Sequence, residues 1–330
     1  MNKVQQAAFD LIREDARFLY ALTDIMRNAK NIDSNYICMS LPYIGLFADG
    51  AEQWCKKIGL NAPTFNPTEK IYYAQLRQSH KLFEKSYVEY RKALLGKLTE
   101  SDDYFYSIRR LREKILGYYN VGTDLCCGEY CGNTILCSMY MPIKTLGNDG
   151  AGSWIKNISI IVGKLAAYLG CTNLPVYKYN DSLTVSYKDY HLYKNSPLKM
   201  NNDTGFLLFS ILCSINYAIK FIENYFIDEI PQKFKYAYLQ YYYLCNFIND
   251  LNSNLGTEYR LDNHLYDRQF RNCIAHYGLG QYITESEIDD TDILKGLTIK
   301  AFKKDYLTTK NELYIMLKSL AEQIKVDVLV

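Results

Sequence analysis

The sequence predicts an all-α protein in which a helical N-terminal region and one small β-hairpin precede a four-helix bundle. Three observations lead to this fold class. Apolar residues recur every three or four positions through long stretches, a spacing typical of amphipathic helices. Only one short stretch alternates apolar and polar residues as a half-buried strand does. After residue 203, four helical stretches are joined by short links, which favours an antiparallel bundle.

Residues 1–170 are expected to form the helical N-terminal region. Tyr72–Leu95 contains no Gly or Pro and carries apolar residues at helical spacing, so we expect one helix there. Asp102–Tyr119 is expected to be another helix, and Ser153–Leu169 a third that ends at Gly170. The Cys- and Gly-rich stretch Asp124–Gly152 lies between them and is expected to form a loop or short strands.

Residues 171–202 are expected to form a hairpin and linker. Leu183, Val185 and Tyr187 alternate with polar residues, and Asn180-Asp181-Ser182 favours a turn, so the pattern indicates a hairpin here. The polar run Lys194–Asp203 follows and marks the expected domain boundary.

Residues 203–330 are expected to form the bundle. Thr204 can cap a helix to about Asp228, and Pro231 suits the first position of a second helix that stops before Gly256. Asp262 or Asn263 can cap a third helix, which Gly278 ends. A fourth helix is expected after an acidic loop, with its apolar residues at Phe302, Tyr306, Leu313, Leu317, Leu320 and Ile324.

Composition and charge indicate a globular cytoplasmic protein that does not enter a membrane. The first twenty residues carry charged side chains throughout and offer no apolar signal core. The most apolar stretch, Phe206–Phe226, is interrupted by charged and amide residues, whereas a membrane span needs about 20 nearly uncharged residues. Residues 201–330 carry 13 Lys and Arg against 17 Asp and Glu, while residues 1–200 carry 25 against 19. A polyanion would therefore need contacts from the N-terminal part.

The ten cysteines do not predict a metal site. Cys126, Cys127, Cys131 and Cys137 cluster, but no second pair follows at zinc-ligand spacing, so structural thiols are expected. No Gly-rich phosphate loop with its Lys occurs either. We therefore expect neither a metal nor a cofactor.

One stretch near the C-terminus carries a candidate chemical site: Arg271-Asn272-Cys273-Ile274-Ala275-His276. On a helix, Phe270, Cys273, Ile274 and Tyr277 form a core-facing stripe. Arg268, Arg271, Asn272 and His276 then share the other side, around the small Ala275. Such a face leaves room for another surface to approach closely.

This combination of side chains suits cleavage of a phosphodiester without metal. An imidazole can take the proton of an RNA 2′-hydroxyl or give one to the leaving oxygen. A guanidinium can hold two phosphate oxygens and offset the charge of the transition state. A single His does not easily act as both base and acid, and a two-fold dimer with these helices face to face would supply a second His and Arg.

Phe270-Arg271-Asn272-Cys273-Ile274-Ala275-His276-Tyr277-Gly278 resembles the signature of the HEPN superfamily: Arg, a polar residue, three to five further residues, and His. The resemblance covers about residues 203–330. It implies a helical bundle, a homodimer through the Arg271–His276 helix, and in many members metal-independent RNA cleavage. Arg271 and His276 would be catalytic and Asn272 supporting. Such domains occur in toxin–antitoxin and phage-defence proteins, so an antitoxin or effector partner is also implied.

A non-cutting bundle that dimerises, or that binds a nucleotide or partner protein, is the alternative. His276 would then interact with the C-terminal dipole of its helix, and Arg271 would pair with Asp267.

Further RNA contacts are expected from basic residues outside the catalytic set. Arg268 lies on the polar face of the same helix. His264 lies about 18 Å along the helix axis from His276 and is a candidate phosphate contact. Arg109, Arg110 and Arg112 interleave with tyrosines, as single-stranded RNA binding sites do. Solvated helix faces that pair with nearby acids are the alternative for that cluster.

Overall fold

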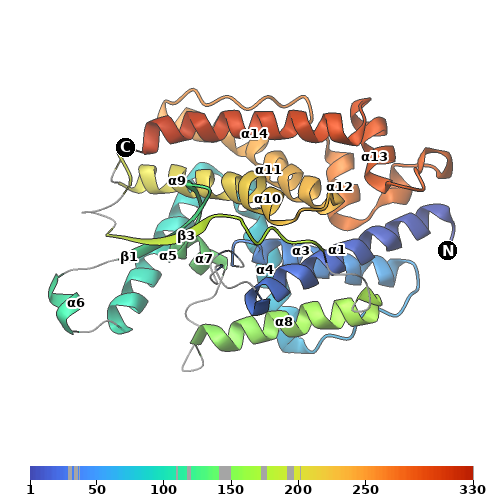
Figure 1. Ribbon diagram of the computed structural model, residues 1–330. Coiled ribbons are helices and arrows are strands. Elements are labelled where there is room, and N and C mark those ends of the chain that lie inside the picture. Colours follow the sequence, from blue (N-terminus) through green and yellow to red (C-terminus); the bar gives the residue numbers. More distant parts are fainter. Residues whose placement is uncertain are drawn as a thin grey trace.

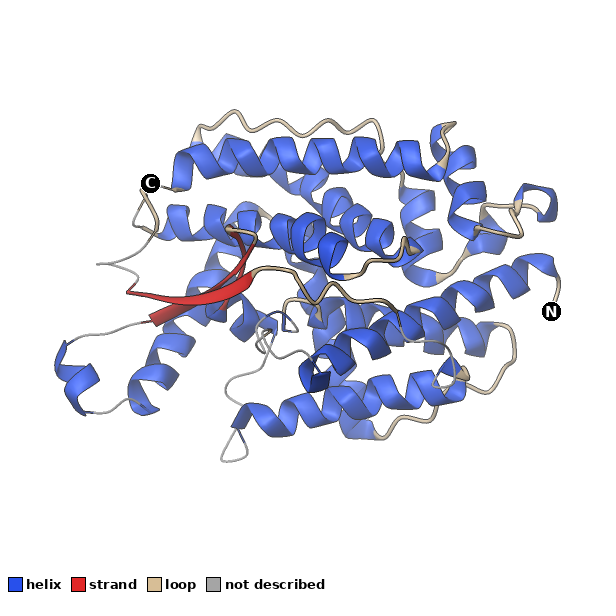
Figure 2. Cartoon of the chain, in the orientation of Figure 1, coloured by secondary structure: helices blue, strands red, loops and turns tan. Residues whose placement is uncertain are grey.

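The protein is a mostly helical molecule with one three-stranded sheet (Figures 1 and 2). The computed structural model describes residues 1–28, 32, 36, 38–108, 111–116, 120–140, 150–171, 177–191, 197–200 and 202–329. In Figure 1 the helices of the C-terminal part lie above those of the N-terminal part, and the sheet lies at one side. The expected all-α class with a small β element is confirmed.

The N-terminal part is built from helices whose bounds are α1 (Lys3–Asn28), α3 (Leu41–Lys57), α4 (Pro67–His80), η1 (Lys81–Glu84), α5 (Tyr87–Ile108), α6 (Leu111–Leu116), α7 (Thr134–Tyr140) and α8 (Gly150–Tyr168).

The helix predicted over Tyr72–Leu95 is interrupted, so that prediction was wrong. Ser86 forms a new helix start, since its backbone and hydroxyl both donate to Glu89. Phe83 turns inward and stacks on Tyr90. This break places Glu84 close to Arg271.

The sheet has the order β2-β1-β3 and is antiparallel throughout. Its strands are β1 (Asn120–Cys126), β2 (Glu129–Asn133) and β3 (Val185–His191). Cys127 and Gly128 join β1 to β2 with φ of 52° and 83°, as a two-residue hairpin turn requires. The hairpin thus lies within the stretch where a loop or short strands were expected. The turn at Asn180 does form, but β3 pairs with β1 and not with a local partner, so the position expected for the hairpin was wrong.

The C-terminal part contains α9 (Asp203–Asn216), which continues through the π-helical η5 (Tyr217–Ile222) into α10 (Glu223–Tyr225), and then α11 (Pro231–Leu255), α12 (Arg268–His276), η6 (Leu279–Gln281), η7 (Glu285–Glu287), α13 (Ile293–Phe302) and α14 (Tyr306–Val328).

Pro231 opens α11 and Gly256 ends it at φ 66°, as expected. Asn202, and not Thr204, caps α9. The expected fourth helix is two helices, because Lys303 adopts φ 58° and Asp305 caps a new start.

One hydrophobic core includes residues from every part of the chain, from Val4 of α1 to Val328 of α14. A buried polar network adds to it. Asp15 of α1 forms an ion pair with Lys235 of α11, and the Tyr277 hydroxyl donates to Asp15 Oδ2 at 2.7 Å. Burial lowers the pKa of Lys235, while the facing carboxylate opposes that change. The N-terminal helices are therefore joined to the segment that follows α12.

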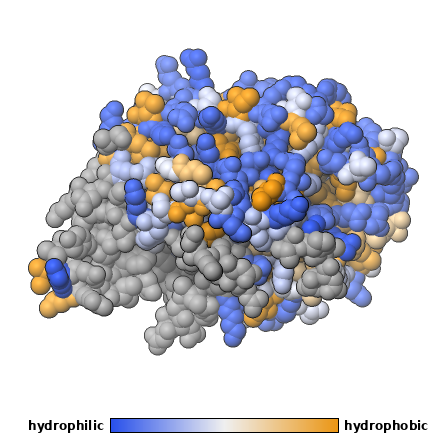
Figure 3. Space-filling model, viewed as in Figure 1, coloured by the Kyte–Doolittle hydropathy of each residue, from blue (hydrophilic) through white to orange (hydrophobic). Residues whose placement is uncertain are grey.

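The helical run Asp203–Tyr225 is long and apolar enough to cross a membrane, the one such run in the described residues, and 94% of its most apolar window is buried inside the fold. Burial of this kind is typical of a core helix. On the face seen in Figure 3, hydrophobic residues are interspersed with hydrophilic ones.

Candidate functional site

Helix α12 positions the candidate catalytic residues. Asp267 caps it, with Oδ1 accepting from the Phe270 backbone at 2.6 Å, and Tyr277 ends it at φ 57°. These bounds correct the expected cap at Asp262 or Asn263 and the expected end at Gly278. The core-facing stripe is confirmed, because its four side chains are buried: Phe270, Cys273, Ile274 and Tyr277.

Arg271 and His276 are in contact. Nη1 of Arg271 lies 3.4 Å from Nε2 of His276. A guanidinium has no acceptor atom, so Nη1 donates and Nε2 accepts. The imidazole is therefore neutral in this arrangement and carries its proton on Nδ1.

The surroundings of His276 keep it neutral. Burial and, in decreasing order of effect, the positive charges of Arg271, Arg77 and Lys81 together lower the pKa of His276 to about 4. Each of these groups disfavours the imidazolium. At neutral pH, His276 is thus in the form that can accept a proton.

Arg271 is held by groups from two other elements. Its Nη2 lies 3.8 Å from Oε1 of Glu84 in η1. The guanidinium carbon lies 4.9 Å from the ring centroid of Tyr242 and 5.8 Å from that of Tyr243, both on α11. Only 15% of the Arg271 side chain is exposed, and its Nε has no hydrogen-bond partner among the described residues. The guanidinium is oriented by tyrosine rings and keeps unused donor capacity.

Arg77 and Lys81 were not predicted as site residues. Arg77 on α4 forms an ion pair with Asp49 of α3 at 2.9 Å, and Lys81 lies in η1. Both lie close enough to His276 to lower its pKa. Neither has a sequence signal linking it to Arg271, because the break at η1 that brings this segment to α12 depends on tertiary packing. The excess of positive charge in residues 1–200 indicated only that basic residues from this part of the chain could contribute to a site.

Ala275 was expected on an open face, but it is buried by a helix of the same chain. A Cβ placed on Gly50 of α3 would lie 2.9 Å from the Ala275 carbonyl oxygen and 3.0 Å from Cε2 of Tyr277. Helix α3 therefore covers this part of α12 and leaves no space for a larger residue at position 50.

The remaining sequence-predicted residues are placed as follows. Asn272 is half-buried, and its side chain has no hydrogen-bond partner among the described residues; Arg268 is exposed at the start of α12. His264 lies before α12 and not within it, and is engaged elsewhere, with Nδ1 2.9 Å from Asp262 and Nε2 3.2 Å from Glu312. Partial burial lowers its pKa, but the two carboxylates outweigh this and the net pKa is raised.

Arg112, on α6, is not brought to this site. Arg112 is exposed, and Figure 1 places α6 at the opposite end of the molecule from α12. Arg109 and Arg110 lie outside the described residues.

The clustered cysteines form no metal site within the described ranges. No group of three or more His, Cys, Asp or Glu side chains there could hold a metal ion. Cys126, Cys131 and Cys137 are buried and Cys127 is exposed. A hydrogen bond from Cys131 lowers the pKa of Cys126 against the effect of burial.

No known family, no curated protein and no solved structure matches this chain. The residues of the site are therefore the guide to what this protein does.

Proposed function

We propose that this protein is a metal-independent endoribonuclease of the HEPN type. The contact between Arg271 and His276 carries the proposal, because it joins a neutral base to a phosphate-binding cation. Arg77 and Lys81 extend the positive charge around the imidazole. Two or more cations beside one base suit a phosphodiester better than an uncharged substrate.

In the proposed reaction, Arg271 binds the scissile phosphate and His276 Nε2 takes the proton of the adjacent 2′-hydroxyl. The 2′-oxygen attacks phosphorus and the P–O5′ bond breaks. The products are a 2′,3′-cyclic phosphate and a 5′-oxygen that must receive a proton. In the homodimer that we also propose, the negative charge of the bound phosphate would stabilise the protonated form of His276 of a second copy, which would supply it. Since α3 covers Ala275, that dimer would use the edge of α12 that holds Arg268 and Asn272.

Substrate binding would itself prepare the base. As described above, Arg271 occupies Nε2 of His276 and lowers its pKa. A bound phosphate would draw the guanidinium to its own oxygens, which releases the Nε2 lone pair. Its negative charge would also raise the pKa of His276 toward the range in which a general base is efficient.

The second candidate function is a non-catalytic module that dimerises or binds a nucleotide or partner protein. One observation favours it: the Arg271 side chain is 15% exposed and is already engaged by Glu84, Tyr242 and Tyr243. In that case Arg271 and His276 would stabilise the packing of α12 on η1 and α11. For either function we propose a cytoplasmic role in phage defence or a toxin–antitoxin system, with an antitoxin or effector as partner.

Cleavage of labelled RNA in EDTA tests the two functions. We expect the wild type to leave 2′,3′-cyclic phosphate ends and to spare a 2′-deoxy substrate, because DNA lacks the nucleophile. His276→Gln keeps a hydrogen-bond acceptor for Arg271 but removes the base, so the folded variant should lose activity. Equal cleavage by both proteins, or cleavage of the 2′-deoxy substrate, would contradict the mechanism. A wild type that cuts no RNA would favour the non-catalytic module.

A further inference from the structure

A cavity of about 340 Å³ opens beside His276. It lies between the first turns of α1, the second half of α3 and the segment that follows α12. The polar residues that line it include Gln5, Gln53, Lys57, His276 and Gln281. None of the lining residues is acidic.

We propose that this cavity binds one nucleobase of the RNA strand, next to the phosphate held by Arg271. The inference rests on the proposed ribonuclease function and adds a base-recognition site to it. His276 lines the cavity and also contacts Arg271, so one side chain borders both the base site and the phosphate site. A nucleotide placed across His276 would present its sugar to the imidazole.

Two amide side chains of the cavity can hydrogen-bond to a base. Oε1 of Gln5 accepts from the Asn2 backbone at 3.0 Å, which leaves the amide N–H groups of Gln5 as donors. Gln53 lies near Asp49 and favours its charged form, and its amide carries both donors and an acceptor. Every nucleobase edge presents donors and acceptors, and amide side chains can pair with both kinds of group.

The floor of the cavity is apolar, and its size suits one base. Val4, Ala8, Trp54 and Ile58 line it together with the Tyr277 ring. Trp54 packs against Phe9, with ring centroids 6.4 Å apart. An apolar floor with a few polar groups is typical of small-molecule sites, and 340 Å³ is near the lower end of their usual volume range.

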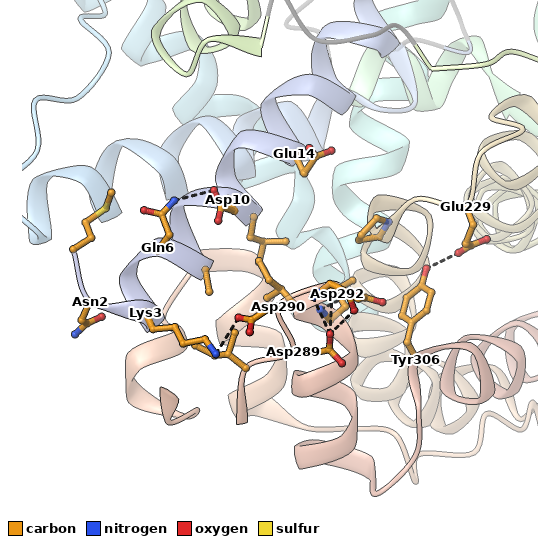
Figure 4. Close-up of a pocket in the computed structure, with 18 residues that line it drawn as sticks. Asn2, Lys3, Gln6, Asp10, Glu14, Glu229, Asp289, Asp290, Asp292 and Tyr306 are labelled. Atoms are coloured by element: carbon orange, nitrogen blue, oxygen red, sulfur yellow. Dashed lines mark hydrogen bonds and ion pairs between the residues drawn. The ribbon is translucent and has the colours of Figure 1, made fainter. Parts of the chain in front are cut away.

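The charge of this cavity differs from that of a second cavity of about 590 Å³ at the other side of α1. Figure 4 shows this second cavity, which is lined by carboxylates, among them those of Asp10, Glu229 and Asp292. Six acidic side chains would repel an RNA strand there. The cavity beside His276 carries Lys57 and no carboxylate, so it is compatible with a polyanion.

Isothermal titration with the four ribonucleoside 3′-monophosphates tests the proposal. These ligands contain no phosphodiester bond, so binding is measured whether or not the protein cleaves RNA. Gly280 lines the cavity, and a Cβ there would meet only Val4, at 3.8 Å. Gly280→Leu should therefore fold, fill the cavity and weaken nucleotide binding by about tenfold or more. Gly163→Leu on α8 is the matched control, since a Cβ there meets nothing within 4 Å.

We expect the wild type and Gly163→Leu to bind at least one nucleotide more tightly than inorganic phosphate. Gln53→Leu should change the ranking of the four bases. Nucleotide binding no tighter than phosphate binding, or equal binding by wild type and Gly280→Leu, would overturn the base site. If nucleotides bind in the cavity but RNA is never cleaved, the ribonuclease proposal fails and the base site stands.

Discussion

Arg271 donates a hydrogen bond to the imidazole of His276, five residues further along the same helix. The bond joins the two residues that the sequence singled out, and it requires a neutral histidine as its acceptor. It also makes the protonation of His276 depend on the position of one guanidinium.

His276 should titrate far below the usual range of a histidine in the folded protein. Its pKa is expected near 4, because burial and three cations disfavour the charged ring. His264, which faces Asp262 and Glu312, should titrate above its ordinary value. NMR of the imidazole C–H signals would separate the two. A His276 signal that titrates near pH 6.5 would contradict the described environment.

Stability should depend on pH through the same group. The folded-state pKa of His276 lies below its unfolded value, so unfolded chains bind more protons as the pH falls from about 6.5 to 4. The stabilisation that comes from keeping His276 neutral is present above pH 6.5 and is lost as the pH falls from about 6.5 to 4. We expect on the order of 2 kcal/mol, measured by denaturant unfolding at several pH values. In His276→Gln the free energy of unfolding should lose this part of its pH dependence. An unchanged pH dependence in the variant would show that His276 is not the group responsible.

Removing the guanidinium should raise the pKa of His276. In Arg271→Ala the imidazole loses a donor at Nε2 and a nearby positive charge, and both changes favour protonation. The His276 titration should move toward the ordinary histidine value. Arg260→Ala is the matched control, since Arg260 is exposed and does not affect His276. Identical His276 titrations in the two variants would show that Arg271 does not influence the ring.

The contact between α3 and α12 predicts a local intolerance to volume. Gly50→Ala would place a methyl group 2.9 Å from the Ala275 carbonyl oxygen, so the two helices must separate. Overpacking of this kind costs about 1–3 kcal/mol of unfolding free energy. Gly96→Ala in α5 meets nothing within 4 Å and should be neutral or slightly stabilising. If both variants unfold at the wild-type denaturant midpoint, the helices are not in close contact.

The buried ion pair between Asp15 and Lys235 predicts that substitutions at these two positions have strongly coupled effects on stability. Lys235→Met leaves Asp15 as an unpaired buried carboxylate, which should cost about 3–5 kcal/mol. Asp15→Leu combined with Lys235→Met should cost clearly less than the sum of the single changes. A double-mutant cycle by urea unfolding measures this difference. Additive effects would mean that the two groups do not interact.

Local patterns in the sequence predicted the features that depend on neighbouring residues. The stripe of Phe270, Cys273 and Ile274 and the end of α11 at Gly256 follow from helical periodicity and from the conformational freedom of glycine. Helix starts were less accurate, because several residues near Asp267 can cap a helix and only packing selects one.

Features that depend on distant residues could not be predicted. β3 pairs with β1 across more than fifty residues, although its own sequence favours a local hairpin. The break between α4 and α5 requires the inward turn of Phe83, which also packs against Phe247 of α11. That break brings Glu84 to Arg271, so this part of the candidate site was not visible in any local pattern.

The bond between Tyr277 and Asp15 joins positions 262 residues apart. During synthesis the ribosome releases α1, α3 and α4 long before α12 exists. The nascent chain therefore lacks the arrangement of Arg271, His276 and Arg77 until α12 has been made. Whatever activity this arrangement carries would begin only after α12 has left the ribosome and packed against the earlier helices.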